Sequence, residues 1–229
     1  MIVLITGISR GIGRALVEQA CSSSRFTKVI GVSRNQDALN EMSSLFDVFE
    51  PIHFDIAQEE FTTLNNGLSS IPHIDVLINN AGYLVNKPFA EWSHQDLYNV
   101  YNINSMAPFK MIQSCYSKLK KSLSPHVINI SSMGGIQGAA KFPGLSGYSS
   151  AKGAVNILTE CLAEEFKEEN IVVNSLSLGA VQTEMLAEAF PGYQAPVLPD
   201  DMAKYILEFS LSGHKVMNGK LNPLSLSTP

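Results

Sequence analysis

Short, continuously apolar runs of β-forming residues recur along the 229-residue chain and alternate with segments of helical spacing. Such runs are typical of strands buried on both faces, as in a parallel sheet. The expected strands are Ile2 to Thr6, Lys28 to Ser33, Val48 to Phe54, Asp75 to Asn79, His126 to Ser131, Ile171 to Ser177 and Lys220 to Leu226. The alternation predicts an α/β fold, a doubly wound parallel sheet of about seven strands with helices on both faces. A ligand crevice is expected at the carboxyl ends of the strands.

Composition and charge limit the kinds of partner. With 45% hydrophobic and 16% charged residues, the chain has an ordinary globular composition, and we expect residues 1–229 to form a single domain. The formal charge of -5 disfavours nucleic acid and anionic lipid as partners, because both require a basic surface. No apolar run is long enough to span a membrane. A small molecule is the expected partner.

The cysteines and histidines form neither a disulfide framework nor a metal-binding pattern. Cys21, Cys115 and Cys161 lie far apart in helix-like stretches, and the histidines are scattered. We therefore expect free thiols in a reducing cytoplasm and no metal site.

Glycines follow the first expected strand directly and precede the first expected helix. They allow a tight turn and close approach of the backbone to a pyrophosphate, while the helix N-terminus favours an anion. The spacing Gly-x-x-x-Gly-x-Gly differs from the common Gly-x-Gly-x-x-Gly fingerprint. We expect a dinucleotide here, and the alternative is a glycine-rich turn without a ligand. The expected contacts are Gly7, Ser9, Arg10, Gly11, Ile12 and Gly13.

The second strand ends at Ser33 and Arg34, where a dinucleotide site meets the adenosine ribose. A free 2′-hydroxyl favours an acidic residue at this point, whereas a 2′-phosphate favours a cation. Arg34 and the nearby Arg10 therefore predict a preference for NADP(H), with NAD(H) as a possible cofactor. The alternative is that both arginines are ordinary solvated surface charges.

Further motifs occur in a fixed order along the chain. After the glycine loop, Asn79-Asn80-Ala81-Gly82 follows the fourth strand, Ile130-Ser131-Ser132 the fifth, and Tyr148-Ser149-Ser150-Ala151-Lys152 opens a helix. Together they resemble the short-chain dehydrogenase/reductase family over nearly the whole chain. The resemblance implies a Rossmann-like domain and an oxidoreductase that reduces a ketone or aldehyde, or oxidises the corresponding alcohol.

The resemblance also implies catalytic roles. Tyr148 and Lys152 are four residues apart and share one helix face, so the ammonium, with an oxidised nicotinamide, is expected to lower the tyrosine pKa. Tyr148 would then act as general acid or base, and Ser132 would hydrogen-bond the substrate oxygen. Asn104, preferred over Asn102, would hold a water that relays protons through Lys152. The alternative for the tyrosine and lysine is an ordinary amphipathic helix face.

Further cofactor contacts are implied by the same resemblance. Tyr148 and Lys152 would also contact the nicotinamide ribose, and a loop after the sixth strand would hold the nicotinamide amide. The remaining implied contacts are Asp55, Ile56, Asn80, Ala81, Gly82, Gly179, Val181 and Thr183.

The chain departs from the family pattern in some segments. Leu178 stands where a proline is usual, and the stretch from 133 to 147 is longer than in most relatives. The substrate loop near 184–199 is short. Candidates to line the substrate pocket are Met185, Phe190, Tyr193, Ile136 and Gln137. By analogy, the helices from Asn102 to Lys121 and from Tyr148 to Lys167 would pair subunits in a homodimer or homotetramer.

Two other functions fit parts of the pattern. The first is a non-catalytic NADP(H)-binding regulator or scaffold, which does not require Ser132, Tyr148 and Lys152 together. The second is a Rossmann-like methyltransferase, which leaves the Tyr-x-x-x-Lys pair unexplained.

Overall fold

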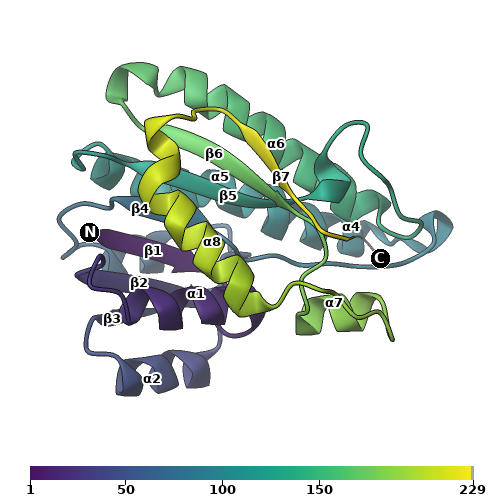
Figure 1. The fold of residues 1–229 in the computed structure, drawn as a ribbon, viewed down its shortest axis with the longest axis horizontal. Coiled ribbons are helices and arrows are strands. Elements are labelled where there is room, and N and C mark those ends of the chain that lie inside the picture. Colours follow the sequence, from purple (N-terminus) through teal and green to yellow (C-terminus); the bar gives the residue numbers. More distant parts are fainter. Residues whose placement is uncertain (228–229) are drawn as a thin grey trace.

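The computed structural model describes residues 1–227 and contains one seven-stranded parallel sheet, in the order β3-β2-β1-β4-β5-β6-β7 (Figure 1). The predicted doubly wound sheet is therefore confirmed. The strands are β1 (Ile2–Thr6), β2 (Lys28–Ser33), β3 (Phe49–His53), β4 (Val76–Asn79), β5 (His126–Ser132), β6 (Val172–Leu178) and β7 (Leu221–Leu224). The predicted strands differ from these by one or two residues at some ends. Pro51 and Pro223 lie within the two edge strands, where a missing N–H breaks no central ladder.

Helices cover both faces of the sheet (Figure 1). They are α1 (Gly11–Cys21), α2 (Gln36–Leu45), α3 (Thr62–Gly67), α4 (His94–Tyr101), α5 (Ala107–Leu119), α6 (Ser146–Glu165), α7 (Glu184–Ala189) and α8 (Pro199–Ser212). Helices α1, α2 and α8 pack on one face, while α3, α5 and α6 pack on the other.

Alternation along the strands divides the core between these faces. In β1, Val3 and Ile5 pack toward α1 and α8, whereas Ile2 and Leu4 pack toward α5 and α6. Successive side chains of a strand point to opposite faces, so a strand that is apolar throughout contributes to both halves of the core. This explains why β1 is an almost unbroken apolar run, whereas β5 and β6 also bury Asn129, Asn174 and Ser175 within the sheet.

One expected helix is interrupted. The segment from Asn102 to Lys121 was expected to be a continuous helix, but a π-helical turn, Asn102–Met106, joins α4 to α5. Single π turns are rare and occur frequently near functional sites. Here the turn brings Asn104, which is fully buried, next to the segment that follows β4.

Candidate active site

A pocket of about 530 Å³ opens at the carboxyl edge of the sheet. Its walls come from the loops that follow β1, β2, β3, β4, β5 and β6, together with the start of α6 and the helix α7. The position agrees with the crevice expected for an open α/β sheet.

The predicted site residues converge on this pocket, with one exception. Every predicted cofactor-binding residue lines it, as do Ser132, Tyr148 and Lys152. Asn104 does not. Its side-chain amide donates to the carbonyl oxygens of Tyr83 (2.6 Å) and Val100 (2.8 Å) and accepts from the Tyr83 amide (3.2 Å). The Asn104 side chain therefore holds the loop after β4 in place from behind the pocket.

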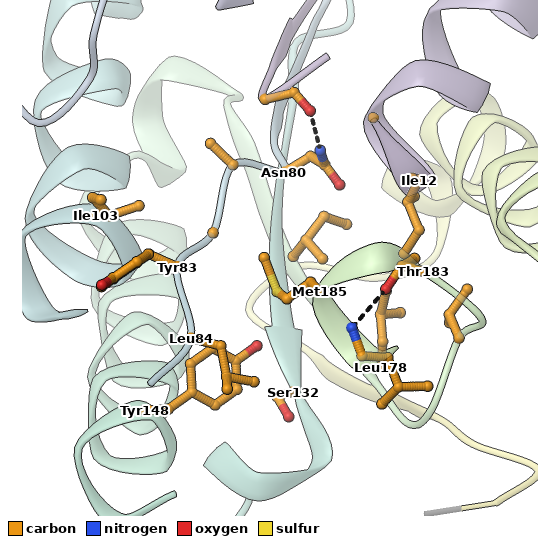
Figure 2. Close-up of a pocket in the computed structure, with 18 of the residues that line it drawn as sticks. Ile12, Asn80, Tyr83, Leu84, Ile103, Ser132, Tyr148, Leu178, Thr183 and Met185 are labelled. Atoms are coloured by element: carbon orange, nitrogen blue, oxygen red, sulfur yellow. Dashed lines mark hydrogen bonds between the residues drawn. The ribbon is translucent and has the colours of Figure 1, made fainter. Parts of the chain in front are cut away.

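The glycine loop forms a cradle that leaves no room for side chains. Gly7 and Gly11 have φ values of 73° and 54°, which favour glycine. A Cβ added at Gly13 would lie 2.0 Å from the Gly7 carbonyl oxygen and 2.5 Å from Nδ2 of Asn80. Asn80 Nδ2 itself donates to the carbonyl oxygens of Thr6 (3.0 Å) and Gly7 (3.2 Å), a contact drawn in Figure 2.

This cradle fits a dinucleotide. The backbone is bare of side chains where a pyrophosphate must come close, and α1 begins at Gly11 with its N-terminus at the pocket. Gly7, Gly11 and Gly13 would hold the phosphates, and Ser33 and Arg34 would meet the adenosine ribose.

Both arginines at this end already have carboxylate partners. Arg10 Nη1 lies 2.5 Å from Oε1 of Glu188 on α7, and Arg34 Nη1 lies 3.7 Å from Oδ2 of Asp55. The side chain of Arg34 is 72% exposed, so its pairing is weak and it is free to turn toward a ligand.

The other end of the pocket holds the polar groups expected to carry chemistry. Tyr148 and Lys152 project from one face of α6, with the lysine Nζ 5.8 Å from the centre of the tyrosine ring. Ser132 ends β5, and Figure 2 shows it facing the same space as Tyr148. Leu84 and Met185 line the same pocket. Lys152 is 3% exposed, and its Nζ donates to the carbonyl oxygen of Ile130 at 2.8 Å.

The expected fall in the tyrosine pKa is not found in the protein alone. Burial raises the pKa of Tyr148 to about 12, against an opposing effect of Ser132. Burial also lowers the pKa of Lys152 to about 8. Both shifts disfavour the charged form of the group, because burial removes that form from water.

A family model described as short chain dehydrogenase matches residues 1–194. The chain belongs to the short-chain dehydrogenase family. It is 31% identical to carbonyl reductase [NADPH] 2 of Sus scrofa over 80% of this chain and 72% of that protein.

Solved structures of dehydrogenases share the fold. A 4-hydroxyisoleucine dehydrogenase complexed with NADH matches with a TM-score of 0.86 and 25% identity, over 98% of this chain and 96% of that chain. ElxO with NADP bound matches with a TM-score of 0.84 and 25% identity, over 97% and 96%. As a member of this family the chain is an oxidoreductase with an NAD(P)-binding Rossmann fold.

Several pocket residues of this short-chain dehydrogenase were not predicted. They are Tyr83, Leu84, Asn86, Phe142, Leu145, Glu184 and Glu188 among others. Of the residues expected to line the substrate pocket, Met185 and Phe190 do so, whereas Ile136, Gln137 and Tyr193 are not among its lining residues. Tyr193 instead donates its hydroxyl proton to Ser227 Oγ at 2.8 Å. Of the unpredicted lining residues, only Tyr83 directly follows a recognised motif, since it comes after Gly82.

Within residues 1–227, no cluster of three or more His, Cys, Asp or Glu side chains could hold a metal ion. None of the helices in the described part of the chain combines the length and apolar character needed to cross a bilayer.

Proposed function

We propose that this short-chain dehydrogenase reduces a ketone or aldehyde with NADPH, or oxidises the corresponding alcohol, with Tyr148 as the acid or base. The observation that carries the proposal is the shared pocket. A glycine cradle without side chains lies at one end, and Ser132, Tyr148 and Lys152 lie together at the other.

Tyr148 and Ser132 have different roles in the proposed reduction. A bound nicotinamide coenzyme would supply the hydride. Tyr148 would donate its hydroxyl proton to the substrate oxygen as negative charge develops there, and the Ser132 hydroxyl would donate a second hydrogen bond to the same oxygen.

The pKa values on the protein side suit the acid role. Because burial raises the pKa of Tyr148 to about 12, the hydroxyl keeps its proton at neutral pH until the substrate oxygen becomes basic. Lys152, whose pKa is lowered to about 8, is still mostly protonated at neutral pH and stabilises the phenolate that remains.

Oxidation needs the opposite shift. To act as a base near neutral pH, Tyr148 must lose its proton more easily, which the Lys152 ammonium and the positive charge of an oxidised nicotinamide both favour. A fall of two to three units corresponds to about 3–4 kcal/mol of differential interaction.

The preference for NADP(H) is supported by Arg10 and Arg34 at the adenosine end, where Ser33 leaves no carboxylate at the end of β2. Asn104 is proposed as a positioning residue. Its side chain is fully occupied by backbone groups, so any water relay would depend on other atoms of the π-helical turn.

A homodimer or homotetramer is proposed on the family analogy, with α5 and α6 as the paired helices. Phe109 and Ile157 on these helices are 50% and 59% exposed, which leaves apolar area for a partner copy. A reducing cytoplasm is proposed because Cys21, Cys115 and Cys161 are all free thiols.

The decisive experiment compares Tyr148→Phe with Tyr205→Phe, an exposed tyrosine on α8 outside the pocket. Turnover of a ketone panel with NADPH, and with NADH beside it, should fall about 10²- to 10⁴-fold in Tyr148→Phe only. Coenzyme binding, measured by fluorescence, should be retained. Full turnover by Tyr148→Phe would refute the mechanism, and a wild type that binds NADPH but turns over nothing would favour the regulator.

A further inference from the structure

The wall around the reacting end of the pocket is mostly apolar. Beyond the hydroxyls of Tyr148 and Ser132, the side chains there come from the loop after β4, the segment 133–147 and α7 with its following residue. The apolar ones are Leu84, Phe142, Leu145, Met185 and Phe190. The uncharged amide of Asn86 also lines the pocket, and its Nδ2 is engaged by the Ala189 carbonyl oxygen.

The charged side chains of the pocket are engaged or lie at its other end. Arg10 is paired with Glu188, and Arg34 lies beside Asp55 at the adenosine side. Glu184 lies near the glycine loop, because its Oε2 would be 3.4 Å from a Cβ at Gly11.

Lys152 is the remaining cation of the pocket. It is 3% exposed and donates to the Ile130 carbonyl oxygen, so it is not open to a charged group on the substrate. Among the described residues that line the pocket, no cation faces the apolar wall. A carboxylate or phosphate bound there would lose its hydration without gaining a partner, which is strongly unfavourable.

The wall is also fixed in place by contacts between its segments. The rings of Phe142 and Phe190 pack edge to face, with centroids 6.3 Å apart at 75°. Asn86 Nδ2 donates to the Ala189 carbonyl oxygen at 2.9 Å, and the Lys87 amide donates to the Gly144 carbonyl oxygen at 3.1 Å. These contacts join the loop after β4 to both other segments.

We infer that the substrate is an uncharged, hydrophobic ketone or aldehyde whose apolar body packs against Phe142 and Phe190. This rests on the proposed function. In the reduction, the carbonyl carbon gains a hydride from the reduced coenzyme and the oxygen gains a proton from Tyr148. The products are an alcohol and oxidised coenzyme, and solvent returns the proton to the tyrosine.

Substrates with a common reacting ketone test the charge requirement. Acetophenone, methyl 4-acetylbenzoate and 4-acetylbenzoate differ mainly in the group opposite the carbonyl, which is respectively absent, neutral and anionic. We expect kcat/KM for the carboxylate to be at least about 100-fold below that for the neutral ester, because the charge would be desolvated without a partner. Equal or better use of the carboxylate would overturn the inference.

A chain-length series tests the apolar contact. From 2-butanone to 2-hexanone, kcat/KM should rise about fourfold for each added methylene that is buried. In Phe190→Ala and Phe142→Ala this rise should shrink, because kcat/KM should fall more for 2-hexanone than for 2-butanone. Phe89→Ala, which removes an 82% exposed ring outside the pocket, is the matched control. An equal loss for both ketones would assign the ring pair a purely structural role.

A binding measurement keeps the inference separate from the proposed function. Calorimetric titration of the same aromatic ketones into NADPH-saturated protein should favour the neutral ester over the carboxylate even if turnover is absent. Absent turnover with this preference contradicts only the proposed function. Turnover with tighter binding of the carboxylate contradicts only the substrate class.

Discussion

The two ends of the pocket are built in different ways. The cofactor end consists mainly of backbone from two loops, the one after β1 and the one after β4, packed so closely that a single Cβ at Gly13 would overlap a carbonyl oxygen. The substrate end consists of side chains from separate segments, such as Phe142 and Phe190. A backbone cradle recognises what all dinucleotides share, whereas a wall of side chains is free to change with the substrate. We expect the first end to tolerate almost no substitution and the second to tolerate many.

The ends also differ in charge. Arg10, Arg34, Asp55 and Glu188 belong to the cofactor end, and the wall of the substrate end has none. Lys152 lies at the boundary. Experiments that alter packing or charge on one side only therefore probe whether the division is real.

The largest effect is expected for Gly13→Ala. Its Cβ would meet the Gly7 carbonyl oxygen at 2.0 Å, and relief of that overlap must move the cradle. Such overpacking costs about 1–3 kcal/mol, so NADPH affinity should fall about 10- to 100-fold in a fluorescence titration, with some loss of stability. Gly153→Ala is the matched control, since its Cβ would lie 3.5 Å from the Gly135 carbonyl oxygen, an ordinary contact. Unchanged affinity in Gly13→Ala would mean that the cradle is not rigid.

At the boundary, Lys152→Met should stabilise the coenzyme-free protein while abolishing turnover. Burial lowers the pKa of Lys152 to about 8, so at pH 7 the fold carries a poorly solvated ammonium. Removing the ammonium stabilises the fold, whereas losing its hydrogen bond to the Ile130 carbonyl oxygen destabilises it. The net result should be a free energy of unfolding that is higher by about 1–2 kcal/mol in urea titrations. Lys204→Met, on the exposed side of α8, serves as control.

The difference in stability between the wild type and Lys152→Met should depend on pH. Above about pH 8 the folded lysine loses its proton while the unfolded lysine keeps it up to about 10.4, so this group makes the wild type more stable as pH rises through that window. The advantage of Lys152→Met should therefore shrink as the pH rises from about 8 to about 10.4. Half-buried Cys21 and buried Cys115, whose pKa values are raised to about 12 by burial, affect both proteins alike. An advantage that grows with pH would contradict the assignment.

Ser33→Asp should shift the preference between coenzymes. Ser33 is 7% exposed at the end of β2, and a carboxylate there would repel a 2′-phosphate but accept a hydrogen bond from a ribose 2′-hydroxyl. Affinity for NADPH should fall about tenfold and affinity for NADH should rise. Ser33→Asn has nearly the same shape without the charge and should change the ratio little. A wild type that binds both coenzymes equally would already refute the preference for NADP(H).

The smallest effect on coenzyme affinity is expected for Glu188→Gln, which removes the ion pair between the glycine loop and α7. Glu188 holds Arg10 toward α7, and a 2′-phosphate would have to compete for that guanidinium. Because both side chains are largely exposed, the gain in NADPH affinity should be only about two- to threefold at low salt, and NADH affinity should not change. Glu208→Gln on α8 lies outside the pocket and should change neither. A gain that persists at high salt would point to a rearranged helix rather than to charge.

The residues predicted to bind the cofactor all lie in one pocket because they follow strands directly. Gly7, Gly13 and Asn80 occupy positions set by β1 and β4, and apolar runs that are buried on both faces mark such strands clearly. Ser132, Tyr148 and Lys152 were identified through the family resemblance, and the end of β5 and the helical spacing agree with their placement. Asn104 was placed in the right neighbourhood, but the π-helical turn that directs its side chain to the Tyr83 backbone leaves no mark in apolar periodicity.

The substrate end was harder to predict because its geometry depends on loop conformation. Ile136 and Phe142 lie in the same glycine-rich segment, and only the fold decides that the second one faces the pocket. The pairing of Arg10 with Glu188 joins residues 178 positions apart and has no local signal. The rise in the Tyr148 pKa in the coenzyme-free protein was not predicted, because spacing shows which charges are neighbours but not how much water they lose.

The π-helical turn between α4 and α5 has a consequence for how this protein can change. A π turn takes up one residue more than an α turn, because its hydrogen bonds span five residues instead of four. Deleting one residue from 102–106 would therefore close this turn into regular α-helix and leave α4 and α5 in register, but Asn104 would lose the position from which its side chain holds the Tyr83 backbone. Loss or gain of the turn is a one-residue step, and its consequence falls on the segment that follows β4.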